Sequence, residues 1–172
     1  MKRIGFGQVE PNHLSAKRNG KIYAQLPANK DIEVLENGMF AKYDYAKNEV
    51  NFSGEGEWML VLNEVKLYDA DWRYTGPNNG VYSAYAMKKG DFMDGVMVPR
   101  LMKTDIGDIF TTNCIYNCDK EDVAVEVGNY LVPNNEGYLA VVSKPDAGMA
   151  WKVVKVYTMP DGQDGVKIQR VQ

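Results

Sequence analysis

Short runs of alternating hydrophobic and polar residues cover most of the chain, and glycine, proline and asparagine separate them. Val123, Val125 and Val127 alternate with polar or small residues, which is the period-two pattern of a half-buried strand. Near the end, residues 151–157 and 166–171 flank the turn 160–165 and predict a hairpin. Roughly ten such runs between residues 31 and 172 predict an all-β domain, a single β-sandwich or barrel.

Three turns and one apolar run organise the first half of this domain. Asn37-Gly38 lies between the apolar runs 32–35 and 39–45 and predicts a hairpin, because a type I′ turn needs positive φ at both central residues. Lys47-Asn48 predicts a second turn before the strand 50–52, and residues 54–56 break the chain. The continuous apolar run at residues 58–62 predicts the start of a long or bent strand over 57–68, buried on both faces.

The stretch 91–115 lies in the middle of the predicted domain. The apolar run 96–98 ends at Pro99, which removes a backbone donor, and Gly107-Asp108 is a turn signal. Residues 109–112 then have the β-branched and aromatic content of a strand. We expect two short strands folded over a turn here, preceded by a further strand over 81–87.

Residues 1–30 differ from the rest of the chain in pattern and in charge. Glycine, proline and asparagine interrupt them too often for a long helix or strand, and only residues 22–26 predict a short strand. This leader has a net charge of +5, and the remaining chain has −8. The sequence therefore predicts an extended basic N-terminal arm over 1–30 before an all-β domain over 31–172. Either the arm docks on an acidic surface, such as a neighbouring copy, or it is a solvated terminus.

Length and composition restrict the class of protein. A chain of 172 residues suffices for one substantial domain that needs no metal or disulfide. No apolar run approaches the ~20 residues of a membrane span, and the N-terminus lacks the apolar segment of a secretory signal. Two cysteines fit synthesis in a reducing compartment. The acidic body lacks a basic stripe with interleaved aromatics and argues against nucleic-acid binding.

The single histidine and the two cysteines are the first candidates for catalysis. His13 lies in the irregular leader, so any triad would have to recruit a terminal arm, and we interpret it as an exposed or interface residue. Cys114 and Cys118 would lie roughly 13 Å apart on a strand, too far for a disulfide. A tight turn between them would allow one, but no second ligand pair for zinc is present. Two reduced structural cysteines are the favoured interpretation.

The long loop 69–80 and the glycines of the leader are the remaining candidates. Asp69 and Asp71 fail the EF-hand pattern, because Tyr74 takes the place of its glycine and Gly80 that of its glutamate. A looser cation site with Asn78 and Asn79 is the alternative to solvated loop polarity. Gly5-x-Gly7 lacks the context of a dinucleotide loop, and nothing singles out a carboxylate pair. We therefore predict no catalytic residues, no metal and no cofactor.

Three stretches resemble the auxiliary head proteins of tailed bacteriophages, the decoration or cement proteins that cover an assembled capsid. They are residues 35–39, residues 107–113 and the closing hairpin of 153–157 with 166–169. The resemblance implies a non-enzymatic virion protein, made in the host cytoplasm, that binds the capsid lattice and stabilises the head. Its partners would be the major capsid protein and neighbouring copies, with a homo-oligomer on the capsid as one arrangement.

On that reading the basic leader makes the contacts. Many weak contacts along a lattice add up through multivalency, and an arm can add main-chain pairing and Lys or Arg contacts to acidic neighbours. The expected contact residues are Lys2, Arg3, Phe6, Lys17, Arg18 and Tyr23, with Trp72, Arg73 and Tyr74 as a second exposed contact loop. The alternative is a stand-alone carbohydrate- or ligand-binding module with its site at Trp72, Arg73, Tyr74 and Tyr82.

Overall fold

The computed structural model describes residues 1–63, 86–92 and 94–172, and within them it is built mostly of antiparallel strands. A six-stranded sheet has the order β1 (Val9–His13), β9 (Ile109–Thr112), β13 (Asp164–Arg170), β12 (Trp151–Thr158), β10 (Tyr130–Pro133) and β11 (Leu139–Val142). A five-stranded sheet has the order β2 (Ile22–Tyr23), β8 (Leu101–Met102), β6 (Met59–Val61), β4 (Phe40–Asp44) and β5 (Glu49–Asn51). β3 (Val34–Glu36) pairs with β7 (Ala86–Lys88), and the short helices are α1 (Ala16–Asn19) and the 3-10 turn Lys89–Asp91.

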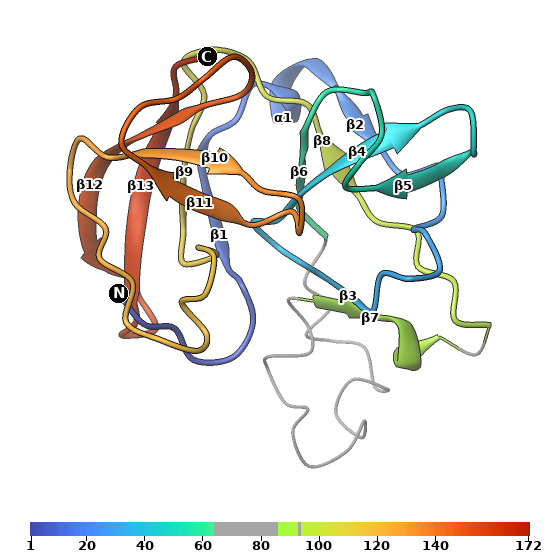
Figure 1. Cartoon of the computed structure of the whole chain (residues 1–172), viewed down its shortest axis with the longest axis horizontal. Coiled ribbons are helices and arrows are strands. Elements are labelled where there is room, and N and C mark those ends of the chain that lie inside the picture. The colour runs from blue at the N-terminus through green and yellow to red at the C-terminus, as the bar shows by residue number, and fades with distance from the viewer. Residues whose placement is uncertain (64–85, 93) are drawn as a thin grey trace.

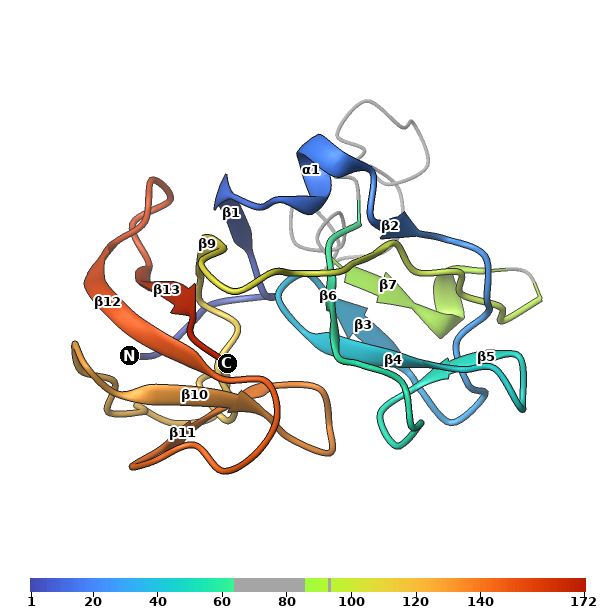
Figure 2. The same cartoon turned by 90° about the horizontal axis from the view of Figure 1, so that it is seen from above.

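The two larger sheets lie side by side and share a core (Figures 1 and 2). The order of the strands does not close into a barrel within the described residues. The all-β prediction is therefore confirmed in its coarse form, as a mostly β protein with several antiparallel sheets.

The five-stranded sheet is buried on both faces. Phe40, Leu60 and Met102 pair across β4, β6 and β8 and face the core shared with the six-stranded sheet. Their neighbours Ala41, Met59, Val61 and Leu101 face a second core beneath β3 and β7. Successive side chains of a strand point to opposite faces, so the continuous apolar run at residues 58–62 supplies both cores. The predicted two-faced burial of this run is confirmed, although β6 covers only Met59–Val61.

An aromatic cluster joins the two larger sheets. Trp151 of β12 packs edge-on against Phe110 of β9, with ring centroids 4.9 Å apart and an interplanar angle of 83°. Phe40 of β4 packs against Trp151 at 5.7 Å. All three side chains are fully buried. These rings therefore hold one sheet against the other.

The leader is not an extended arm. β1 pairs with β9 at the edge of the six-stranded sheet, and Leu14 and Ala16 belong to the shared core. The backbone N–H of Arg3 donates to Cys118 O at 2.9 Å. Most glycines and prolines of the leader lie between short segments, but Pro11 lies within β1, where the register against β9 shifts between Glu10 and His13. The predicted strand at 22–26 shrinks to β2, Ile22–Tyr23.

The predicted hairpin at Asn37-Gly38 is wrong. β3 pairs with β7, and β4 pairs with β5 and β6, so the turn passes from one sheet to another. Gly38 has φ of 97°, and a Cβ there would lie 2.6 Å from the Cys114 Cβ. The glycine is needed for this close approach and not for a type I′ turn. The second predicted turn is confirmed, with Asn48 at φ 55° between β4 and β5.

The two short strands predicted within residues 91–115 are present as β8 and β9 but do not pair with each other, and the strand predicted at 123–127 is absent. Within the stretch 91–115, β8 pairs with β2 and β6, whereas β9 pairs with β1 and β13, so these two strands do not form a unit. Residues 123–127 form no strand. Val123 and Val125 pack against the shared core, but the Glu126 N–H donates to the Asn129 side chain and not to a ladder. The closing hairpin of β12 and β13 is confirmed. Predictions over residues 64–85 lie outside the described residues.

Candidate functional site

The structure separates the contact residues predicted in the leader into two groups. Lys2, Lys17 and Arg18 are exposed. Arg3 is 4% exposed, Phe6 lies under Lys88 Nζ at 4.5 Å, and Tyr23 packs edge-on against Tyr43 at 5.9 Å. Half of the predicted contact residues are therefore engaged with the body of the same chain. Trp72, Arg73, Tyr74 and Tyr82 lie outside the described residues.

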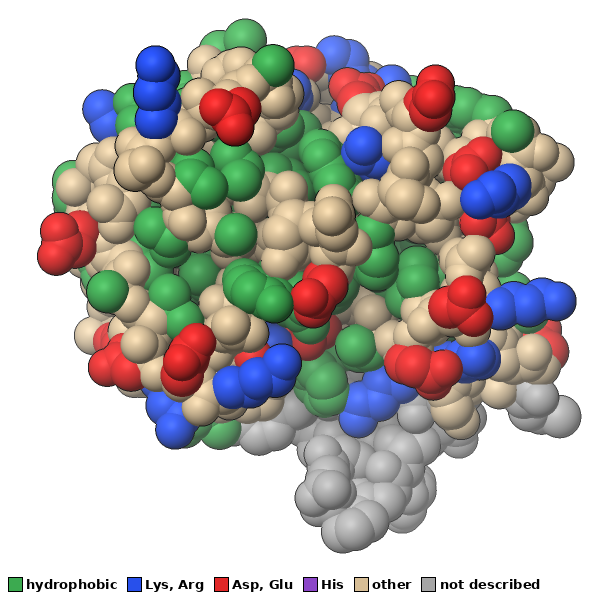
Figure 3. Space-filling model, viewed as in Figure 1, with side chains coloured by type: hydrophobic (Ala, Val, Ile, Leu, Met, Phe, Trp, Pro, Cys, Tyr) green, Lys and Arg blue, Asp and Glu red, His purple; other side chains and the backbone are tan. Residues whose placement is uncertain are grey.

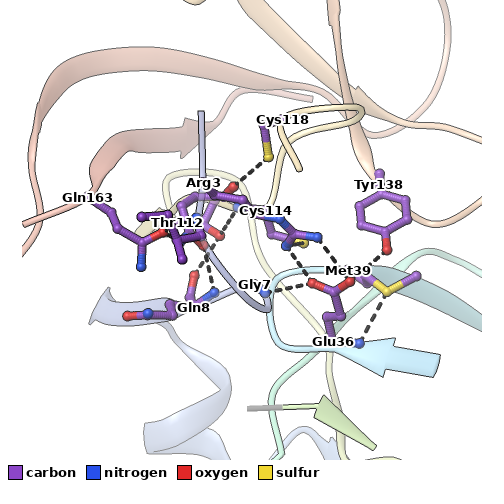
Figure 4. A network of polar contacts seen from close by, with 12 residues as sticks. Arg3, Gly7, Gln8, Glu36, Met39, Thr112, Cys114, Cys118, Tyr138 and Gln163 are labelled. Carbon is purple, nitrogen blue, oxygen red and sulfur yellow. Dashed lines mark hydrogen bonds and ion pairs between the residues drawn. The ribbon is translucent and has the colours of Figure 1, made fainter. Parts of the chain in front are cut away.

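Arg3 is bound by a buried carboxylate at the end of β3 (Figure 4). The Arg3 guanidinium donates to both oxygens of Glu36, through Nη1 to Oε2 and through Nη2 to Oε1 at 3.0 Å. Gly7 N–H donates to Oε2 at 2.6 Å and Tyr138 Oη donates to Oε1 at 2.8 Å. Glu36 is only 3% exposed. A buried charge needs such full pairing to be tolerated.

The backbone around this ion pair is closely packed on the side of Gly7. A Cβ at Gly7 would lie 2.4 Å from Asn37 O and 2.8 Å from Cys114 Sγ. Burial raises the pKa of Tyr138, and the nearby Glu36 carboxylate adds to the rise, so its hydroxyl stays a donor. We interpret the group of Arg3, Gly7, Glu36 and Tyr138 as a structural clasp between the leader and β3. Sequence analysis missed Glu36 because a charged residue before Asn-Gly is the pattern of an exposed turn.

The cysteines belong to the same buried region and are not bonded to each other. Cys114 and Cys118 are free and fully buried, and Cys118 Sγ donates to Asn113 O at 3.0 Å. Burial raises the pKa of both thiols, and the Glu36 carboxylate adds to the rise. The favoured prediction of two reduced structural cysteines agrees with this arrangement. Among the described residues, no three His, Cys, Asp or Glu side chains gather as a metal site.

Native protein is therefore expected to resist alkylation at both cysteines. Only the thiolate reacts, and burial together with a raised pKa makes it scarce and inaccessible. Treatment with iodoacetamide at pH 8, followed by intact mass spectrometry, should give no adduct in buffer and two adducts in strong denaturant. One rapid addition to the native protein would show that at least one thiol is reactive and accessible.

The outer face of the six-stranded sheet presents a group of cations with no described carboxylate in an ion pair. We call Lys152, Lys155, Lys167 and Tyr157 the lysine face. Lys155 of β12 lies directly opposite Lys167 of β13, and their Nζ atoms lie 5.3 and 5.9 Å from the centre of the Tyr157 ring. Like charges placed opposite each other in a sheet destabilise it, and the ring offsets this only in part.

One carboxylate lies under this face, and a tyrosine covers it. Register places Glu10 of β1 in the same cross-strand row as Thr111, Lys167 and Lys155. Tyr157 Oη donates to Glu10 Oε2 at 2.6 Å, whereas Glu10 Oε1 is buried without a partner among the described residues. Burial raises the pKa of Tyr157, as does this hydrogen bond. The tyrosine therefore stays protonated and lies across the sheet between the lysines and the leader.

Exposed residues of the leader extend the lysine face toward the edge strand. His13 of β1 lies in the cross-strand row of Gln169 and Lys152, and Arg18 Nη2 approaches His13 Nε2 at 2.7 Å. The chain as a whole has a net charge of −3. A sheet face that gathers cations without an ion pair to any described carboxylate, on a protein of net charge −3, is suited to an acidic partner surface.

No helix among the described residues is long and apolar enough to cross a membrane. No family model matches the sequence, and neither the curated proteins nor the solved structures contain a significant match.

Proposed function

We propose that the protein is a non-enzymatic structural protein of a tailed-phage head that binds the outer capsid lattice and stabilises the head. The resemblance of residues 35–39, 107–113 and the closing hairpin to head decoration proteins suggests this role. The lysine face is the structural observation that best supports this role. Partners would be the major capsid protein and neighbouring copies of this chain.

The lysine face has the physical properties of a docking surface for an acidic lattice. Lys152 and Lys155 are exposed and Lys167 is half-buried, and none forms an ion pair with a described carboxylate. Charges at the rim of an interface add modestly to affinity but raise the association rate and fix orientation. Because a lattice offers many equivalent sites, modest contacts per copy suffice for stable coverage.

The leader contributes to this surface as part of the body. Lys2, Lys17 and Arg18 stay exposed and are available to a neighbouring subunit, whereas Arg3 is held in the clasp. The proposal therefore assigns docking to a preformed face, with Arg18 at its edge beside His13, and not to a free arm. A preformed face binds without the cost of ordering a flexible segment.

Charge reversal at the lysine face tests the proposal. We expect the double variant Lys155→Glu/Lys167→Glu to bind undecorated phage heads about tenfold more weakly than the unaltered protein. Binding of both proteins should weaken as salt is raised, because exposed charges are screened. Co-sedimentation of the protein with purified heads over a range of concentrations gives the affinity.

The matched control changes two exposed lysines elsewhere. Lys30→Glu/Lys120→Glu alters the net charge by the same amount, and these residues lie outside the lysine face. The control should bind as the unaltered protein does. Equal weakening of both double variants would point to net charge alone, and unchanged binding of the lysine-face variant would refute the assigned surface. Failure of the unaltered protein to bind any candidate head would refute the function itself.

A further inference from the structure

A second feature lies between the two larger sheets, away from the lysine face. A cleft of about 730 Å³ separates β4 and residues 56–58 on one side from β10, β11 and the β11–β12 connection on the other. Figure 3 shows hydrophobic side chains along the seam between these two halves of the molecule. We call this cavity the inter-sheet cleft. Its main lining residues are Lys42, Trp58, Pro133, Val142, Lys144 and Arg170.

Cations stand on opposite walls of this cleft. Lys42 of β4 lies with its Nζ 4.6 Å from the centre of the Trp58 ring. Lys144 lies across the cleft in the β11–β12 connection and is exposed. Neither lysine forms an ion pair with a described carboxylate.

Of the other charged residues that line the cleft, Glu57 and Arg170 are engaged and Asp146 is a carboxylate. Glu57 pairs with Lys103 at 2.5 Å, and Arg170 Nη1 donates to Thr104 Oγ1 at 3.1 Å. Asp146 is an exposed carboxylate with no described ion pair. The two lysines without a described ion pair and the apolar lining side chains therefore determine which class of ligand the cleft can bind.

We infer that the inter-sheet cleft binds a short acidic segment of a partner protein in which carboxylates alternate with aliphatic side chains. The aliphatic side chains would cover Pro133, Val142 and the edge of Trp58, and the carboxylates would pair with Lys42 and Lys144. The volume lies in the range of sites that bury a drug-sized ligand or a few residues of peptide. The Trp58 ring holds the Lys42 side chain in place, so less entropy is lost when the carboxylate binds.

Two other classes of occupant fit less well. A small carboxylate could satisfy one lysine, but it would leave the apolar wall of the cleft in water. A nucleic acid could offer phosphates to both lysines, but its polar backbone would leave Pro133 and Val142 uncovered. The peptide is the occupant that pairs the cations and covers the apolar wall together. This inference does not require that the protein binds capsids.

Titration of the full-length, ¹⁵N-labelled protein with short blocked peptides tests the inference. The probe is acetyl-Glu-Val-Glu-Val-Glu-amide, and the matched probes have Gln or Lys in place of every Glu. We expect the acidic peptide to shift amide resonances of residues 42, 56–58, 132, 142–144 and 146–149. The other two peptides should bind at least about fivefold more weakly. Glucuronate, as a small anion, should bind more weakly than the acidic peptide.

Paired variants locate the binding. Lys42→Gln/Lys144→Gln should weaken the acidic peptide at least about fivefold, and Lys30→Gln/Lys120→Gln, at exposed lysines outside the cleft and the lysine face, should leave it unchanged. The amide spectra of both variants report directly whether they are folded. Shifts confined to the lysine face, equal binding of the Lys peptide, or tighter binding of glucuronate would each overturn the inference.

Discussion

Replacing Arg3 by methionine should lower the free energy of unfolding by about 3–5 kcal/mol. The change keeps most of the side-chain volume but leaves the Glu36 carboxylate buried with only Gly7 N–H and Tyr138 Oη as donors. Removing one member of a buried ion pair is costly because the remaining charge has lost its partner but cannot return to water. Urea denaturation at pH 7, followed by tryptophan fluorescence, measures the difference.

A double-mutant cycle separates the pair from the burial of each charge. Glu36→Gln should cost a comparable amount, because Arg3 then keeps its charge without a counterion. The double variant Arg3→Met/Glu36→Met should cost much less than the two single changes added together, since no buried charge is left unpaired. Arg3 Nε is itself buried without a described partner, so the native pair is not ideally satisfied.

An exposed ion pair provides the control. Lys21 pairs with Asp105 at 3.0 Å, and both side chains are nearly half exposed. Lys21→Ala should therefore cost less than about 1 kcal/mol. A loss for Arg3→Met as small as that for Lys21→Ala would show that the clasp does not hold the leader on the body in solution.

The excess of positive charge in residues 1–30 predicted a docking arm, but part of this charge pairs with carboxylates of the same chain. The basic leader was expected to meet an acidic surface, and part of that surface belongs to its own chain, at Glu36 and Asp105. Sequence shows the excess of charge but not which carboxylates come near it, because the contact spans 33 residues at Arg3 and 84 at Lys21. The separation into leader and body was an accurate reading of composition but a poor guide to structure.

Local patterns predicted the strands that pair with their sequence neighbours. The hairpin of β12 and β13 followed from two alternating runs and one turn, and β4 with β5 followed from Lys47-Asn48. Asn37-Gly38 failed because its glycine serves packing against Cys114 and Thr112, which are distant in sequence. A turn signal states that the chain bends, but not which strands then pair.

The lysine face was partly accessible to sequence analysis. Lys152, Lys155 and Lys167 occur in two strands that were predicted to form one hairpin. A bulge between Val153 and Lys155 shifts the register, and this shift places Lys155 opposite Lys167. Such a shift moves side chains from one face of a sheet to the other, so the face could be assembled only from the structure.

Replacing Trp151 by alanine should lower the free energy of unfolding by about 3–5 kcal/mol. Trp151 is fully buried between Phe110 of its own sheet and Phe40 of the five-stranded sheet. Its removal opens a cavity where the two sheets meet, and neither ring can move to fill it without leaving its own strand. Thermal and urea unfolding followed by circular dichroism measure the loss, since the variant lacks the main tryptophan reporter of the core.

Trp151→Phe is the matched variant that distinguishes lost packing from a lost hydrogen bond as the cause of the destabilisation. The indole Nε1 is buried without a partner among the described residues, so the phenyl ring loses no hydrogen bond and only part of the packed volume. We therefore expect Trp151→Phe to cost clearly less than Trp151→Ala. An equal cost for the two changes would mean that the indole N–H makes an important interaction, and that packing between Phe40 and Phe110 is not what joins the sheets.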